Sequence, residues 1–242
     1  MKKSLILLGM LALLLLSACT PATPAGDQNI IPQVSVSGVG KVYLTPDIAY
    51  VLVGVHSESE SVLEALNKNN KDAKAISDTL QEMGLEVRDI QTTAFNVFPQ
   101  QKYGPNGEMQ GTYYVVENSV YITVRDLEEL GKLLDAVVRS GANSINSIIF
   151  DVEDKTAAYS QARKLAVQDA VAQAKELTEA AGVELGDLVN LSAYSSGVPV
   201  PLYEGKGGAM AMAPGEVPVA AGQLVLIMNA NLTYEIRQPG GK

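Results

Sequence analysis

Few side chains in this sequence have the type and spacing that catalysis or metal binding requires. His56 is the only histidine of the 242 residues, and it closely precedes Glu58 and Glu60, so an imidazole and a carboxylate could share a cation. One imidazole supplies too few ligands for a multi-histidine metal centre, and it makes an ordinary Ser-His-Asp triad improbable. We therefore predict that His56 is a solvated residue at the end of a strand.

The stretch Gly38-Val39-Gly40 is compatible with a phosphate-binding loop or with a bent strand. A dinucleotide fingerprint needs a third glycine at the position that Tyr43 occupies, followed by a helix. Residues 41–44 instead continue as a strand pattern, and the chain contains no G-x-x-x-x-G-K-[ST] motif. The glycines indicate a bulge or a close approach of backbone. Asp47, after Pro46, is typical of a turn cap rather than of a general base.

Met210-Ala211-Met212 is the least ordinary local feature of the sequence. In an oxidising compartment two thioethers can ligate Cu(I) or act as a sacrificial target of oxidants. Copper carriers usually have longer clusters of Met and His, so two incidental methionines in a Gly/Pro-rich loop are the favoured interpretation. We predict no catalytic residue, no metal site and no cofactor. A hydrolase that uses Ser or Asp would also lack the G-x-S-x-G elbow.

The N-terminus has the pattern of a bacterial lipoprotein signal peptide. Two lysines precede an apolar run over residues 5–16, which is too short for a comfortable membrane span. The sequence LLSAC at residues 15–19 then places the chain's only cysteine after two small residues, which is the lipobox pattern. We predict cleavage after residue 18 and a diacylglycerol on Cys19, with an ordinary secretory signal as the alternative. Thr20, rather than Asp, favours the outer membrane in a host with two membranes.

Charge excludes several classes of partner for the mature chain. Residues 1–18 contain two lysines and no acidic residue, so their removal leaves 16 basic against 27 acidic residues and a formal charge of −11. This balance argues against binding to nucleic acid or to anionic lipid. Residues 19–32, rich in Pro, Ala and Thr, predict a flexible tether, and residues 238–242 a short tail.

Hydrophobic periodicity predicts helices separated by strands that mostly come in pairs. Helices are expected at residues 58–83, 126–139 and 155–181, the second capped by Asp126 and the third carrying a stripe of alanines. Strands are expected at residues 33–44, 48–56, 87–98, 112–124, 145–152, 188–194 and 223–236. This order predicts an α+β fold with mostly antiparallel sheets and long helices packed on one face.

Five segments in this order resemble the SIMPL domain family, which includes the 26-kDa periplasmic immunogenic proteins. Residues 36–49, 118–127, 141–150, 162–170 and 233–236 carry the resemblance. They contain the motif residues Gly38, Gly40, Pro46, Asp47, Arg125, Asp126, Gly141, Asn143, Arg163, Asp169 and Tyr234. We interpret these residues as structural, and we expect Asp169 to face Arg125 or Lys164.

The resemblance implies two interleaved two-layer subdomains, residues 33–89 with 186–237 and residues 90–185. It also implies a location outside the cytoplasm, ring-like oligomers in some members, a link of some members to oxidative-stress defence, and no accepted catalytic activity. The lipobox departs from the many members that are soluble in the periplasm.

Two functional hypotheses follow. Tyr103, Tyr113, Tyr114 and Tyr121 gather around one predicted hairpin, and exposed tyrosines are frequent in interfaces. With the close-packing alanine helix, they favour a non-enzymatic, self-associating envelope lipoprotein that contributes to envelope or oxidative-stress tolerance. The alternative is a lipid-anchored binding module that uses the loop at residues 195–222 for a protein, glycan or small ligand.

Overall fold

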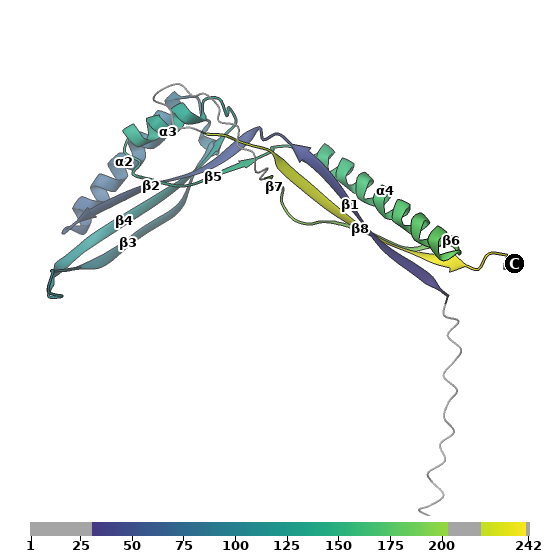
Figure 1. Cartoon of the computed structure of the whole chain (residues 1–242). Helices are drawn as coiled ribbons and strands as arrows, with labels where there is room; N and C mark the ends of the chain where they lie inside the picture. The colour runs from purple at the N-terminus through teal and green to yellow at the C-terminus, as the bar shows by residue number, and fades with distance from the viewer. Residues whose placement is uncertain (1–30, 203–218, 241–242) are drawn as a thin grey trace, which may run out of the picture.

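The computed structural model describes residues 31–202 and 219–240, which form two layered units (Figure 1). Within these residues, three α-helices and eight strands make two antiparallel sheets, each covered by helices on one face. The α+β fold predicted from the sequence is therefore confirmed. The predicted leader, residues 19–30 of the predicted tether with Cys19, and the Met210–Met212 motif lie outside the described residues.

The first unit joins the two ends of the described chain. Its sheet has the order β1-β8-β6, and a short strand β7 also pairs with β8. The strands are β1 (Gln33–Leu44), β6 (Glu184–Ser195), β7 (Val200–Pro201) and β8 (Leu224–Arg237). Helix α4 (Thr156–Ala181) packs along β1 and β8. Gln33 lies opposite Glu235, so both ends of the described chain reach the same end of this unit (Figure 1).

The second unit is a continuous stretch of chain between β1 and α4. Its sheet has the order β3-β4-β2-β5. The strands are β2 (Ile48–Ser59), β3 (Ile90–Tyr103), β4 (Met109–Val124) and β5 (Ser144–Asp151). Helices α2 (Val62–Glu82) and α3 (Leu130–Arg139) cover one face, and a 3-10 turn, η1 (Val87–Asp89), leads into β3.

Strand pairing divides the chain differently from the predicted subdomains. The units are residues 33–44 with 156–237, and residues 48–152, rather than residues 33–89 with 186–237 and residues 90–185. The bounds that the resemblance implied placed residues 48–89 in the first unit, whereas β2 and its helix α2 belong to the second. The three residues between β1 and β2 do not close a hairpin: β1 pairs with β8, and β2 pairs with β4 and β5.

The two units have cores of different composition. In the second unit, large aliphatic side chains fill the space between helices and sheet, among them Ile76, Leu80, Leu134 and Val53. In the first unit, five alanines of α4 lie directly on the sheet, at positions 158, 162, 166, 170 and 174. Leu165 and Leu177 of the same helix are 38% and 51% exposed. Alanines at intervals of four residues leave no room on the buried face for the leucines.

Several element boundaries differ from the predicted ones because strand pairing continues through polar sequence. Residues 58 and 59 were expected to start a helix, but β2 extends through residue 59, with residues 57–59 opposite residues 114–116 of β4. The predicted polar loop at residues 99–111 is mostly a β3–β4 hairpin, whose turn is residues 104–108. Alternating ladder hydrogen bonds do not require apolar side chains, so hydropathy alone misses them.

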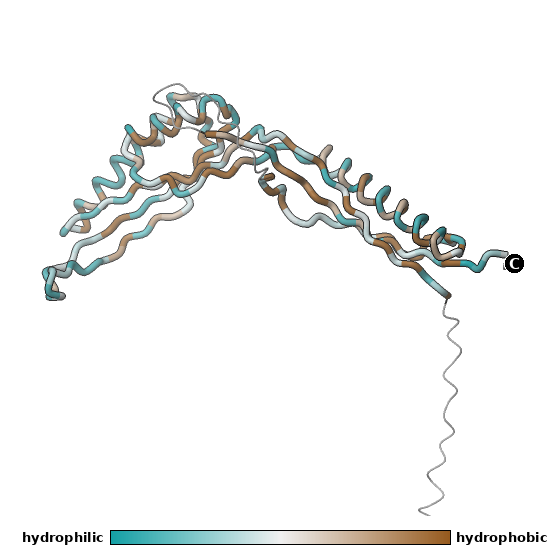
Figure 2. The backbone as a smooth tube through the Cα atoms, in the orientation of Figure 1, coloured by the Kyte–Doolittle hydropathy of each residue, from teal (hydrophilic) through white to brown (hydrophobic). Residues whose placement is uncertain are grey.

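The molecule is elongated and bends where the two units meet (Figure 1). Figure 2 shows apolar residues concentrated on the inner strands of both sheets. Val219 belongs to the segment before β8, yet it packs against the core of the second unit. Among the described residues, no helix combines the length and apolar character needed to cross a bilayer.

Candidate functional site

The two glycines of the Gly-x-Gly stretch bring β1 into contact with the backbone of α4. A Cβ on Gly40 would lie 2.0 Å from the carbonyl oxygen of Ala162, and a Cβ on Gly38 would lie 2.2 Å from that of Ala166. Glycine is needed here for close approach, since any side chain would overlap the helix. The strand continues through both positions, so the prediction of a close backbone approach is confirmed.

Asp169 supports the same contact. Its Oδ2 accepts a hydrogen bond from the backbone N–H of Val39 at 2.8 Å, and another from the side chain of Gln173 at 3.0 Å. The Val39 N–H points away from β8 on an edge strand, so a carboxylate from the helix takes the place of a neighbouring strand. Asp169 therefore links α4 to β1 and does not form the predicted pair with Arg125 or Lys164.

The motif residues Arg163 and Tyr234 lie outside and inside the contact between α4 and the sheet, respectively. Arg163 is exposed on α4, and no ion pair joins it to another of the described residues. Tyr234 lies on β8 between Val34 and Leu188 and packs partly buried against the alanine core. Neither arrangement brings a reactive group to a cavity.

Asp47 and Arg125 hold the junction between the units. The Oδ1 of Asp47 accepts the N–H of Glu153 at 2.8 Å, and its own N–H donates to the carbonyl of Asp151 at 3.1 Å. Pro46, which precedes it, is buried. Asp47 was predicted to cap the turn at residues 45–47, but its carboxylate instead accepts an N–H of the chain that leaves β5.

The guanidinium of Arg125 bridges two carboxylates next to this junction. Its Nη1 lies 2.5 Å from Oδ2 of the buried Asp89, and its Nε lies 3.0 Å from Oε1 of Glu153. Hydrogen bonds to Asp89 and then to Glu153 raise the pKa of Arg125. Asp126 was expected to cap α3, but its Oδ1 accepts the N–H of Glu128 in a turn before that helix begins.

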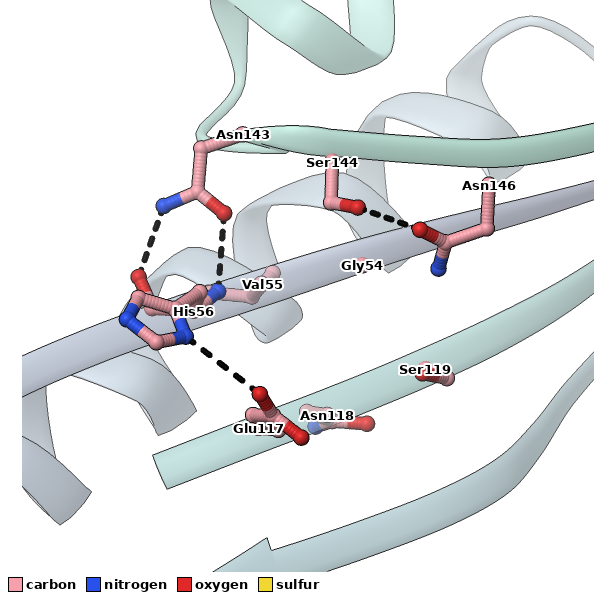
Figure 3. Close-up of a pocket in the computed structure, with 9 residues that line it drawn as sticks. All are labelled: Gly54, Val55, His56, Glu117, Asn118, Ser119, Asn143, Ser144 and Asn146. Carbon is pink, nitrogen blue, oxygen red and sulfur yellow. Dashed lines mark hydrogen bonds and ion pairs between the residues drawn. The ribbon is translucent and has the colours of Figure 1, made fainter. Parts of the chain in front are cut away.

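Gly141 and Asn143 attach β5 to the sheet. Gly141 follows α3 with φ of +123°, and a Cβ there would lie 2.9 Å from the Cβ of Asp72. The side chain of Asn143 then pairs with the backbone of His56 as another strand would. Its Oδ1 accepts the His56 N–H at 2.8 Å, and its Nδ2 donates to the His56 carbonyl at 2.6 Å (Figure 3). Through these contacts the motif holds the start of β5 against β2.

His56 lies at the edge of a hollow on the face of the second sheet that the helices leave open (Figure 3). Its Nε2 is 2.8 Å from Glu58 Oε1, and its Nδ1 is 3.6 Å from Glu117 Oε1. The ring is 42% exposed, which confirms a solvated histidine, although β2 continues three residues beyond it. Among the described residues, no three His, Cys, Asp or Glu side chains are placed to hold a metal ion.

The hollow could not be predicted from the sequence, because residues of β2, β4 and the start of β5 form it together. Its volume is about 580 Å³, and it is lined by Gly54, Val55, His56, Glu117, Asn118, Ser119, Asn143, Ser144 and Asn146. One local signal was present: Gly54 interrupts an otherwise apolar β2, and an isolated glycine in a strand often marks a bulge or an open position.

A comparison with known protein families gives the same family as the sequence motifs indicated. The model of the SIMPL family, described as a protein of unknown function (DUF541), matches residues 34–234. The chain belongs to the SIMPL family. The resemblance that the sequence motifs indicated is thereby confirmed, and the motif residues now have positions in the fold of a member.

Relatives within the family have names that indicate location rather than chemistry. The 26 kDa periplasmic immunogenic protein of Brucella melitensis is 34% identical over 212 residues, which cover 85% of this chain and 85% of that protein. The protein of the same name from Brucella abortus is 33% identical over the same length. The uncharacterized protein YggE of Escherichia coli K12 is 26% identical over 165 residues, which cover 68% of this chain and 67% of that protein.

Proposed function

We propose that this SIMPL protein is a non-enzymatic lipoprotein of the cell envelope that associates with further copies of itself. In this role it contributes to envelope or oxidative-stress tolerance. The observation that supports self-association is the exposure of apolar side chains on two edge strands. On β3, Phe95, Val97 and Phe98 are between 39% and 47% exposed, and on β6, Leu188, Val189 and Leu191 are about half exposed.

Strand β3 has few of the charged side chains that protect the edge strands of monomeric proteins. It is 14 residues long and pairs only with β4, so its other edge presents unpaired backbone groups. Lys102 is its only charged residue, and Pro99 its only proline. A long apolar edge of this kind is a template for pairing or packing against another chain.

The mass in solution tests this part of the proposal. We would measure it by light scattering after gel filtration, on the chain from Thr20 onward. We expect a discrete assembly for the wild type and a smaller mass for Phe95→Asp combined with Val97→Asp. Val138→Asp, at a half-exposed position on α3, is the matched control and should leave the mass unchanged. A wild type that runs as a monomer would refute self-association.

The leader and the names of the relatives support the envelope location. The Brucella proteins are named as periplasmic, and this chain carries the lipobox cysteine, Cys19. The anchor would place the protein on the periplasmic face of the outer membrane, or outside the cytoplasmic membrane of a host with only one. Wild-type protein should label with a fatty-acid probe and sediment with membranes. Cys19→Ala should abolish both, and labelling that persists would contradict the proposal.

The loop at residues 195–222 is the second candidate for function, as a partner-binding element. Its ends are held on the first sheet, since Ser196 N–H donates to the Ile227 carbonyl and Leu202 N–H to the Gln223 carbonyl. Residues 203–218 lie outside the described part. Their deletion should leave self-association intact and abolish capture of any partner that uses the loop.

A further inference from the structure

The hollow beside His56 is a preformed cavity in the open face of the second sheet. Its volume of about 580 Å³ lies within the range of about 300–1,000 Å³ that small-molecule sites occupy. It is separate from the apolar edge of β3 and from the residues that hold the two units together. Binding of a ligand in this cavity would therefore be independent of self-association.

The hollow exists because three neighbouring strands have small or displaced residues at one level. Gly54 of β2 lies opposite Ser119 of β4 and Ser144 of β5. The register between β2 and β5 shifts after Leu52, which leaves Asn146 without a partner in the ladder. The Asn146 side chain reaches over Gly54: its Nδ2 is 3.6 Å from the position that a Cβ on Gly54 would take.

Hydrogen bonds between residues of the cavity wall determine which of their polar atoms remain free to bind a ligand. The hydroxyl of Ser144 lies 2.6 Å from Asn146 Oδ1 and orients that amide, so the Nδ2 donors of Asn146 are left for a ligand (Figure 3). On the opposite wall, the half-exposed Glu117 carboxylate faces His56 through one oxygen only. Donor and acceptor groups thus face each other across the cavity, held by ordered strands.

The charges of the lining exclude anionic ligands. None of the described residues that line the hollow is Lys or Arg, and Glu117, with Glu58 beyond His56, makes its edge acidic. A phosphate or carboxylate ligand would be repelled and would lack a charged donor. Amide, hydroxyl and carboxylate groups suit a neutral ligand with many hydroxyls.

An aromatic surface adjoins the polar cavity on the same face of the sheet. Tyr121 lies two residues along β4 from Ser119, and its ring stacks on that of Tyr50 with the centroids 5.3 Å apart. Tyrosine rings present an apolar body with a polar tip, which suits the C–H faces and hydroxyls of a sugar. We propose that the hollow and the adjoining tyrosines bind a neutral oligosaccharide.

Isothermal titration of the purified full-length protein with neutral tetrasaccharides tests this proposal. The probes are chitotetraose and maltotetraose, and tetragalacturonate serves as an anionic counterpart. We expect at least one neutral probe to bind with a dissociation constant of about 1 mM or below, and the anionic probe to bind at least tenfold more weakly. Absence of binding by both neutral probes up to about 10 mM, or equal binding of tetragalacturonate, would overturn the proposal.

Matched variants place the binding in the hollow. Asn146→Ala removes the Nδ2 donors and Glu117→Gln removes the negative charge of the facing acceptor, and each change should weaken binding by about tenfold. Asn190→Ala and Glu184→Gln change exposed residues on β6 in the other sheet and should bind as the wild type does. Thermal unfolding verifies that all four variants fold. Binding that Asn146→Ala and Glu117→Gln leave unchanged would show that the hollow is not the site.

Discussion

Replacement of Gly40 by alanine is the sharpest test of how the first unit is built. The new Cβ would lie 2.0 Å from the carbonyl oxygen of Ala162 and 2.6 Å from the backbone nitrogen of Ala166, where ordinary contact needs 3.4 Å or more. Both clashing atoms belong to the helix backbone, so no side-chain rotamer can relieve the overlap. Helix α4 must move away from β1 by more than an ångström.

The loss of stability in Gly40→Ala arises because this movement separates α4 from the sheet. The alanines of α4 are packed on β1 and β8 with almost no exposed surface, and a displaced helix opens a gap along all of them. Overpacking of a tight core costs about 1–3 kcal/mol. We place Gly40→Ala at the upper end, at about 3 kcal/mol, because the surrounding groups are backbone and cannot repack. Val39→Ala, on the open face of the same strand, is the control and should cost less than about 1 kcal/mol.

Urea denaturation followed by circular dichroism measures the loss, and hydrogen exchange locates it. Amides of α4 and β1 should lose protection in Gly40→Ala, whereas amides of β2 and β4 in the second unit should keep theirs. The double variant with Ala162→Gly should show no rescue, since removal of the alanine methyl leaves the clashing carbonyl in place. Rescue by Ala162→Gly, or a loss below about 0.5 kcal/mol, would refute the account of close backbone approach.

Three further predictions concern single contacts. Asp169→Ala should expose β1 to exchange at Val39 by removing the acceptor of that N–H, while Asp169→Asn, which retains an acceptor oxygen, should not. Asn143→Ala should destabilise the second unit by about 1–3 kcal/mol in urea titrations, since two backbone groups of His56 lose their partner; an unchanged midpoint would contradict this role. Hydrogen bonds from the N–H and then the hydroxyl of Thr156 lower the pKa of Asp154 below its ordinary 3.8. The ionised carboxylate therefore stabilises the start of α4 above pH 3.8, and this contribution is lost as the pH falls through the lowered pKa. Melting temperatures of Asp154→Asn and wild type should differ above pH 3.8 and converge at a pH below the lowered pKa.

Local pattern in the sequence was sufficient for most elements of the fold. The stripe of alanines at intervals of four residues predicted a close-packed helix, and Gly38 and Gly40 predicted a close backbone approach. Both predictions are steric statements about single segments, so they hold without knowledge of the neighbours. The family motifs were readable for the same reason, because each is a short segment with a local structural role.

The sequence failed where the partner of a segment lies far along the chain. Nothing local distinguishes a three-residue hairpin turn from a three-residue passage between two sheets, so residues 45–47 did not reveal which sheet β2 joins. The polar stretch at residues 99–103 became strand because β4 pairs with it. Asp169 was assigned a charged partner, whereas an edge-strand N–H from 130 residues away is what it accepts.

The amino-acid sequence by itself determined the leader pattern, the acidic charge, the α+β class and membership of the family. The tertiary structure alone decided which strands pair, and therefore which side chains share a surface. The hollow beside His56 shows the physical reason: Gly54, Ser119 and Asn146 are ordinary residues in separate segments. They form a cavity only because antiparallel register and one bulge bring them to the same level of one sheet.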